Sequence, residues 1–233
     1  MLVWQRPGVA VSIPGYSGKN VFREWQGGHV IRNPNTVGWG MIVALPLATA
    51  GCAAISTVAP LTIPLAYKEN PENGATLISL SCPYLAHVQV IDKRADPVLG
   101  IRYLESKPLK ADVTAGNDPA VWAQGGIEAY LRQNHVKTGE VGPTLLLELQ
   151  SLKTSEDIDH RAGYDARITF AASLQSPMGK SCWHAALDGK GGNYGYAGSI
   201  ANYQETLNEA LDKTASQVLT SADFNTALCH CAD

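Results

Sequence analysis

The stretch ARITFAASLQS, residues 166–176, alternates regularly between two kinds of side chain. Ile168, Phe170 and Leu174 are apolar, and the residues between them are mostly polar or small. Because successive side chains of a β-strand point to opposite faces of its sheet, this alternation predicts a strand with one buried face and one solvated face. Strands of that kind are typical of an antiparallel sheet that is covered on one side only.

Five other stretches predict further strands around this one. They are TLISLS at 76–81, AHVQVID at 86–92, GIRYLES at 100–106, PTLLLELQSL at 143–152 and SCWHAALDG at 181–189. We interpret two polar stretches as connections rather than strands. These are the charged residues 156–161, expected to be a solvated loop, and the glycine-rich GKGGNYGYAGS at 189–199, expected to be a flexible loop.

Two stretches predict helices. The first follows Asp118, whose carboxylate suits an N-cap, and Pro119, whose missing N–H costs nothing at the first helical position. Gly125-Gly126 inside this helix indicates close packing against a neighbour. The second helix covers about residues 199–222, and Asn202 with Glu205 resembles a capping pair at its start.

The order of elements is therefore strands, a helix, three strands and a helix. This order predicts an α+β fold, a two-layer sandwich of a mostly antiparallel sheet with two main helices on one face. We assign it to a single domain at residues 75–233.

The N-terminal part of the chain has a different character. The run from Gly38 to Ala50 carries no charge, and it is shorter than the roughly 20 residues that span a bilayer. It suits the apolar core of a signal peptide. A signal that begins at Met1 would be too long, whereas one that begins at Val30 has Arg32 near its start. We therefore interpret residues 1–29 as a non-translated or disordered extension and residues 30–51 as a signal peptide.

Ala50-Gly51-Cys52 resembles the lipobox of bacterial lipoproteins, in which the cysteine is acylated and becomes the N-terminus. Thr49 stands where that box prefers leucine. An ordinary secretory signal and a buried apolar strand are the alternatives. Cleavage before Cys52 would change the formal net charge from −3 to −6, because residues 1–51 hold four basic side chains and one acidic one. Such an acidic domain is unsuited to nucleic acid.

Residues 52–74 contain three prolines and predict a lipidated tether. Leu61, Ile63 and Leu65 within it could still form an edge strand, because prolines are tolerated at sheet edges.

Four cysteines remain after Cys52, namely Cys82, Cys182, Cys229 and Cys231. An even number in an exported domain predicts disulfides. Cys229 and Cys231 are too close in sequence to pair readily with each other, so we expect Cys182 to pair with one of them.

A metal site is the alternative reading of the same region. Cys182, His184, Cys229, His230 and Cys231 offer ligands suited to zinc or copper, although their spacing is not that of a zinc finger.

Asp92 and Arg94 follow a predicted strand and could bind a ligand. The simpler reading is a turn in which Asp92 caps backbone N–H groups and Arg94 pairs with an acid. The sequence contains no G-x-S-x-G in a suitable context, no H-E-x-x-H and no phosphate-binding glycine loop.

Taken in order, AGC, VIDKRAD, VLGIRY, YLRQNHV and TLLLELQSL resemble the YajG-type bacterial outer-membrane lipoproteins and the related auxiliary lipoproteins of ABC transporters. Val90, Asp92 and Arg94 match the V-x-D-x-R stretch of that family. The resemblance implies a two-layer domain at the outer membrane that faces the periplasm and has no catalytic residues. The Cys229-His230-Cys231 tail lies outside the family pattern.

These observations together predict a non-enzymatic, lipid-anchored envelope protein without a cofactor. We expect it to act through protein contacts, with exposed strand edges as docking sites, and a homo-oligomer is compatible with this reading. A periplasmic metal- or redox-active binding protein is the second candidate, and an exported enzyme with an unrecognised site is the third.

Overall fold

The computed structural model describes residues 59–71, 82, 84–85, 87–103, 110–139, 141–157 and 162–231. Residues Ala54–Asp233 form one compact unit that contains every described helix and strand. The predicted signal peptide, Cys52 and the expected strand at 76–81 lie outside the described residues.

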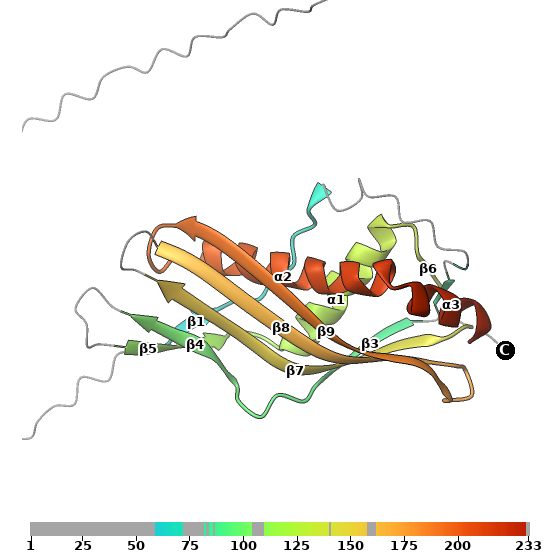
Figure 1. Cartoon of the computed structure of the whole chain (residues 1–233). Helices are drawn as coiled ribbons and strands as arrows, with labels where there is room; N and C mark the ends of the chain where they lie inside the picture. The colour runs from blue at the N-terminus through green and yellow to red at the C-terminus, as the bar shows by residue number, and fades with distance from the viewer. Residues whose placement is uncertain are drawn as a thin grey trace, which may run out of the picture. The chain divides into compact units, whose positions relative to one another are not determined.

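A four-stranded sheet forms one layer of the molecule (Figure 1). It contains β3 (His87–Asp92), β7 (Thr144–Asp157), β8 (Ala162–Gln175) and β9 (Ser181–Gly195) in the order β3-β7-β8-β9. The three long strands are antiparallel to one another, and β3 runs parallel to β7. All of the stretch at 166–176 except its last residue lies within β8, and its apolar side chains are buried as its alternation predicts.

Shorter strands form two further sheets. One sheet has the order β1-β5-β4, formed by β1 (Leu61–Ile63), β5 (Lys110–Ala115) and β4 (Val98–Tyr103). At Gly100, β4 passes so close to β7 that a Cβ atom would lie 1.8 Å from the carbonyl oxygen of Thr154. A two-residue parallel pair joins β2 (Tyr84–Leu85) to β6 (Lys137–Thr138).

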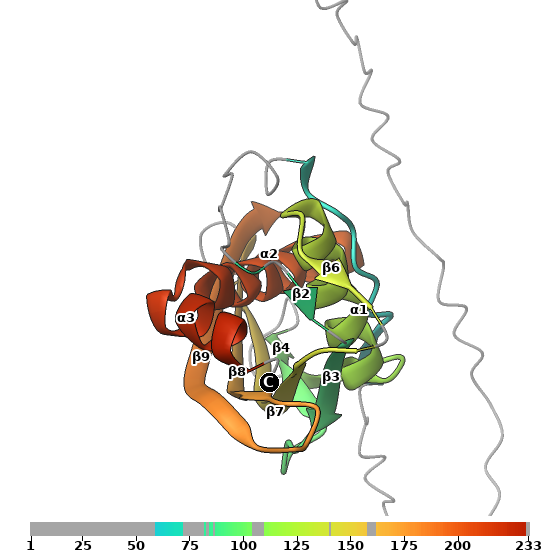
Figure 2. The same ribbon diagram turned by 90° about the vertical axis from the view of Figure 1, so that its right-hand side faces the viewer.

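Helices α1 (Pro119–Gln133) and α2 (Ile200–Thr220) form the second layer, and α3 (Ala222–His230) follows α2. Figure 2 shows these helices on one side and the four-stranded sheet on the other, with β2 and β6 beside the helices. Asp118 caps α1 as predicted, with Oδ1 accepting from the backbone N–H of Ala120 at 2.8 Å. The expected Asn202–Glu205 cap is wrong, because α2 begins earlier and Ser199 accepts the backbone N–H of Asn202 instead.

The core lies between the two layers. On α1, Ala123, Ile127, Tyr130 and Leu131 are buried, which is the face predicted by helical spacing. Only the second glycine of Gly125-Gly126 is closely packed. A Cβ atom at position 126 would lie 2.5 Å from Leu211 of α2, whereas one at position 125 would meet nothing within 4 Å. The α+β two-layer fold class is confirmed.

The prediction of a flexible loop from residue 189 is wrong, because β9 continues to Gly195. The glycines are there because α2 lies directly over the strand. A Cβ atom at Gly189 would lie 2.0 Å from the carbonyl oxygen of Ala210, and one at Gly191 would lie 2.0 Å from that of Thr206. Glycine therefore allows the helix backbone to approach the strand backbone at these two positions.

The described part of the expected tether, residues 59–71, belongs to the fold. β1 pairs in parallel with β5 at the edge of its sheet, and Ile63 is fully buried. Leu65 exchanges two hydrogen bonds with the side chain of Asn117, and the hydroxyl of Tyr67 donates to Asp212 at 2.7 Å. The edge strand that we considered for this stretch is present, so the described residues 59–71 are not part of a tether.

Within the described part of the chain, none of the helices has the length and apolar character that crossing a membrane requires.

Gly191→Ala tests the close approach of β9 and α2. We expect it to lower the free energy of unfolding by about 1–3 kcal/mol, because a methyl group would press on the backbone of α2. Gly192→Ala is the matched control, since its Cβ atom would have no neighbour nearer than 3.7 Å. Urea unfolding measures both. Equal effects of the two substitutions would contradict this packing.

Candidate functional site

The four cysteines of the domain form two disulfides at one end of the sandwich. Cys182 pairs with Cys231, one of the two partners left open for it by the sequence, and Cys82 pairs with Cys229. The end of α3 is thereby joined both to β9 and to the segment before β2. The pairs are 49 and 147 residues apart in sequence, so each removes loop entropy worth about 4–5 kcal/mol from the unfolded chain.

The alternative metal site is not supported by this arrangement. A metal ion needs thiolates, and the sulfurs of Cys182, Cys229 and Cys231 are bonded to other sulfurs. His184 and His230 are exposed. Among the described residues, no three His, Cys, Asp or Glu side chains gather closely enough to hold a metal ion.

Asp92 and Arg94 form a salt bridge with each other. The Arg94 Nε and Nη2 atoms donate to the two carboxylate oxygens of Asp92 at 2.9 and 2.8 Å, and the Arg94 backbone N–H donates to Oδ1 at 3.0 Å. These hydrogen bonds hold the pKa of Asp92 below its usual value. The turn interpretation therefore describes this pair.

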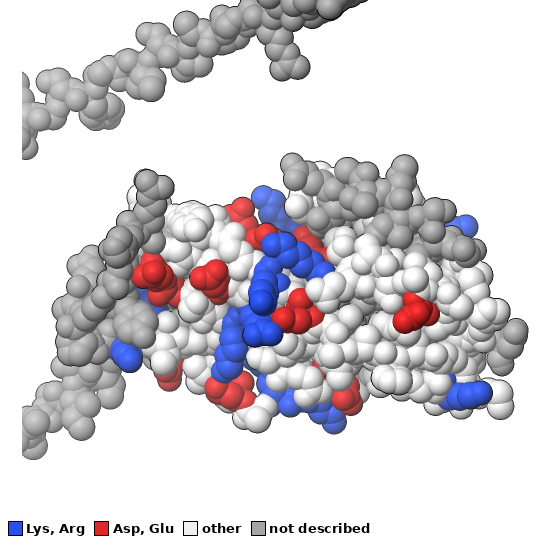
Figure 3. All heavy atoms as spheres, in the orientation of Figure 1, with Lys and Arg blue, Asp and Glu red and all other residues white. Residues whose placement is uncertain are grey.

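A row of basic side chains crosses the open face of the large sheet. Lys153, Arg167 and Lys190 are direct neighbours in the register of β7, β8 and β9, and the band of blue in the middle of Figure 3 runs over this part. Arg167 forms a bidentate pair with Asp188 at 2.7 and 2.8 Å, and Lys153 pairs with Asp96 at 2.5 Å. Because acidic side chains already form ion pairs with two of the three cations, the row is poorly suited to binding a phosphate group.

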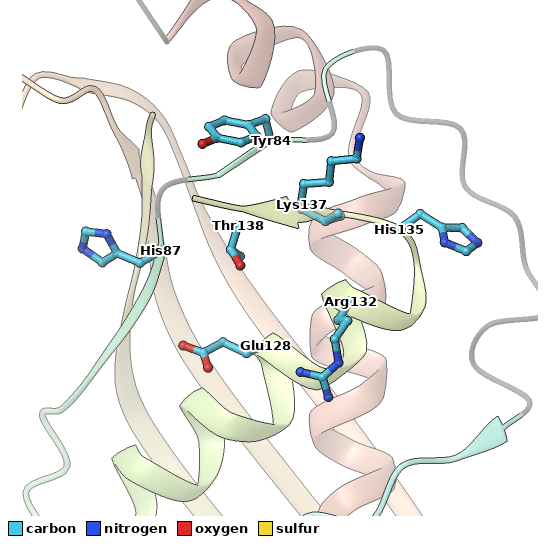
Figure 4. A pocket seen from close by; sticks show the side chains of 8 residues that line it. Tyr84, His87, Glu128, Arg132, His135, Lys137 and Thr138 are labelled. Atoms are coloured by element: carbon cyan, nitrogen blue, oxygen red, sulfur yellow. The ribbon is translucent and has the colours of Figure 1, made fainter. Parts of the chain in front are cut away.

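A hollow of about 690 Å³ lies between α1 and the β2–β6 pair. Figure 4 shows Glu128 and Arg132 on its α1 side and Tyr84 across from them, while Lys137 and His135 point outward. Arg132 is paired with Glu69 at 2.8 Å, and Glu128 accepts from Gln124 at 3.0 Å. These side chains pair with residues beside the hollow, and they do not converge on a common point as the groups of an active site do.

The most concentrated polar arrangement surrounds Glu156, near the end of β7. Its side chain is fully buried, and both carboxylate oxygens have donors. Oε1 accepts from the Tyr164 hydroxyl at 3.1 Å and from the Gly198 backbone N–H at 2.5 Å. Oε2 accepts from the Tyr203 hydroxyl at 2.9 Å and lies 3.5 Å from Nε of Arg102.

The surroundings of Glu156 suit a buried negative charge. A buried carboxylate is tolerated only when it is paired and hydrogen-bonded, and here it has a guanidinium group and three hydrogen-bond donors. It also lies beside the first turn of α2, where the helix dipole favours a negative charge. Burial, followed by the hydrogen bond to Glu156, raises the pKa of Tyr203 above its ordinary value. Burial likewise raises the pKa of Tyr164.

The cluster also holds the loop between β9 and α2. The hydroxyl of Tyr164 lies within hydrogen-bonding distance of the Tyr196 carbonyl oxygen and accepts the Ser199 backbone N–H at 3.0 Å. Gly198 has a φ of 71°, and a Cβ atom there would lie 2.2 Å from Nη2 of Arg102. The positive φ favours glycine at this position, and a Cβ atom would also displace the guanidinium group of Arg102.

Sequence reasoning missed this cluster. The prediction that residues 156–161 form a solvated loop is wrong for Glu156, which lies in β7 with its side chain in the core. The two-residue period of Leu145, Leu147 and Leu149 would place Glu156 on the open face. A bulge between Leu149 and Ser151 shifts that period, so that Leu152, Thr154 and Glu156 are buried instead. With its side chain closed to solvent, Glu156 holds elements together and does not meet a substrate.

No protein family model matches this chain, and no curated protein matches it in sequence. Solved structures similar to it include a Xanthomonas campestris protein described by the family model DUF330, with 9% identity over 74% of this chain and 95% of that one and a TM-score of 0.43. A Caulobacter crescentus "putative lipoprotein" has 11% identity, coverage of 68% and 96%, and a TM-score of 0.39. A minor lipoprotein of Acinetobacter baumannii has 14% identity, coverage of 64% and 96%, and a TM-score of 0.37.

Two of these three proteins are thus described as lipoproteins. None of the three is described as YajG-type or as part of a transporter, so that part of the expectation stays a prediction.

Tyr203→Phe tests whether the cluster stabilises the domain. We expect the free energy of unfolding to fall by about 1–3 kcal/mol, because one oxygen of a buried carboxylate loses a hydrogen-bond donor. Tyr194→Phe is the control, since Tyr194 is exposed and its loss of a hydroxyl should change stability little. Urea unfolding at neutral pH distinguishes the two.

A pH series gives the same substitution a second readout. The pKa of Tyr203 is raised in the folded state, so its contribution to stability is complete below the unfolded value of about 10 and is lost as the pH rises beyond it. The wild type should therefore lose more stability between pH 9 and pH 11 than Tyr203→Phe does. Identical slopes would show that the hydroxyl is not held in this way.

Proposed function

We propose that this protein is an exported lipoprotein in which Cys52 becomes the acylated N-terminus. A signal-like apolar run precedes the Ala50-Gly51-Cys52 sequence. The observation that carries the proposal is the pairing of the other four cysteines with one another, which leaves Cys52 as the one thiol outside a disulfide. Disulfides of this kind are typical of proteins that fold in an oxidising compartment.

The domain faces the periplasm from the outer membrane in this proposal. The alanine that follows Cys52, by analogy with bacterial lipoproteins, favours the outer membrane over the inner one. Several acyl chains on one cysteine suffice to hold a water-exposed domain at a bilayer, because each buried methylene contributes about 0.8 kcal/mol.

The domain acts without catalysis in this proposal, as an accessory or assembly factor that binds envelope proteins. This role is supported by the pairing of charged side chains on the described parts of the open sheet face and of the hollow, such as Arg167 with Asp188 and Arg132 with Glu69. The proposed relation to YajG-type proteins and to auxiliary lipoproteins of ABC transporters belongs to the same reading, and self-association is one form that such contacts could take.

The described structure limits where a partner could add a strand. The backbone N–H and carbonyl of Asp188, on the outer edge of β9, bind the side chain of Gln217 at 3.1 and 2.8 Å. Glu209 accepts the Gly192 backbone N–H at 2.9 Å. Since side chains of α2 occupy this part of the edge, docking by strand addition is disfavoured there, and partner contacts are expected on other surfaces.

Mass spectrometry of the protein from bacterial membranes tests acylation. We expect a mature chain that begins at Cys52 with acyl chains attached, recovered with the outer membrane. Cys52→Ser should abolish both the acyl mass and the cleavage. Thr49→Leu is the matched control, because it brings the box closer to its preferred sequence and should preserve acylation. A cysteine without lipid, still joined to residues 38–51, would refute the proposal.

A further inference from the structure

Two tyrosines at the end of β9 project into solvent. Tyr194 is 76% exposed and Tyr196 is 90% exposed, which places them among the most exposed large hydrophobic side chains in the described structure. No side chain from Gly191 to Gln204 carries a charge. Water-exposed aromatic side chains on an uncharged loop suggest a contact surface rather than a solvated connection.

The loop that carries these tyrosines has a fixed backbone. The Gly198 N–H donates to Glu156 and the Ser199 N–H donates to the Tyr164 hydroxyl, which also lies within hydrogen-bonding distance of the Tyr196 carbonyl oxygen. The tyrosine side chains are therefore displayed from an ordered frame. Binding through a loop whose backbone is already ordered costs little conformational entropy, and this favours the two tyrosines as a contact surface.

The same end of the domain receives the chain that comes from Cys52. Arg102 of β4 lies against Gly198 and is paired with Ala111 of β5. β1 runs parallel to β5, with Leu61 opposite Val113, so it begins at this end, where Figure 1 also shows the tip of β9. Cys52 lies seven positions before Ala59, a stretch that can span at most about 25 Å.

We propose that Tyr194 and Tyr196 make a second contact with the lipid bilayer, at the level of its headgroups. This inference rests on the proposed lipidation of Cys52, which brings this end of the domain within reach of the membrane. Tyrosine suits the boundary because its ring enters the apolar side while its hydroxyl stays hydrated. The two-point contact fixes the orientation of the domain, with α3, its disulfides and the β8–β9 turn directed away from the bilayer.

Tryptophan fluorescence in vesicles tests this contact. The chain from Cys52 to Asp233, which contains every described element, is oxidised and coupled through Cys52 to a maleimide phospholipid. The vesicles contain phosphatidylcholine and phosphatidylethanolamine, with and without brominated acyl chains. Tyr196→Trp is compared with Met178→Trp, because Met178 is 89% exposed but lies in the turn between β8 and β9 at the other end. The native Trp122 and Trp183 are buried and give a common background.

We expect brominated lipid to quench Tyr196→Trp and its emission to move to shorter wavelength, with neither change in Met178→Trp. Equal quenching of the two variants, or quenching of Met178→Trp alone, would overturn the proposal. So would a Tyr196→Trp signal that responds to an envelope protein extract but not to lipid. Because the lipid is attached chemically, this result is independent of whether Cys52 is acylated in the cell, and the two proposals can fail separately. Circular dichroism confirms that both variants are folded.

Discussion

The buried carboxylate of Glu156 is the constraint on which one end of this domain depends. A carboxylate that is buried away from solvent must be balanced by a positive charge and by hydrogen-bond donors. Here these groups come from four different parts of the chain, namely Arg102 of β4, Tyr164 of β8, Tyr203 of α2 and Gly198 of the loop before α2. Removing any of these groups leaves the charge less well compensated. The carboxylate therefore fixes the relative position of the sheet, the helix and the loop at once.

The opposite end of the sandwich is held by different chemistry. There the two disulfides join α3 to β9 and to the segment before β2, and they act largely by restricting the unfolded chain. Between the two ends, α2 lies so close to β9 that glycine is needed at positions 189 and 191. The long helix is thus held at its start by a buried charge, along its length by direct backbone contact and beyond its end by covalent bonds.

The parts of the fold that could be predicted are those with a repeating pattern. The alternation in β8 and the spacing of Ile127 and Leu131 on α1 are local signals, and both faces are buried as expected. The extent of β9 was missed because its glycines resemble those of a loop, and their need arises only from the approach of α2. Glu156 was missed because an isolated acid in sequence resembles a solvated one. Its partners lie 42 to 54 residues away along the chain, except for Tyr164.

The same carboxylate connects the architecture with the proposed role, since it orders the loop that displays Tyr194 and Tyr196. The most direct measurement of this central claim is amide hydrogen exchange at Gly198 and Ser199 in the folded domain. If Glu156 and Tyr164 hold these two N–H groups, they should exchange as slowly as amides in the middle of β8, although they lie in a loop. Exchange as fast as that of the exposed turn near Met178 would contradict the account.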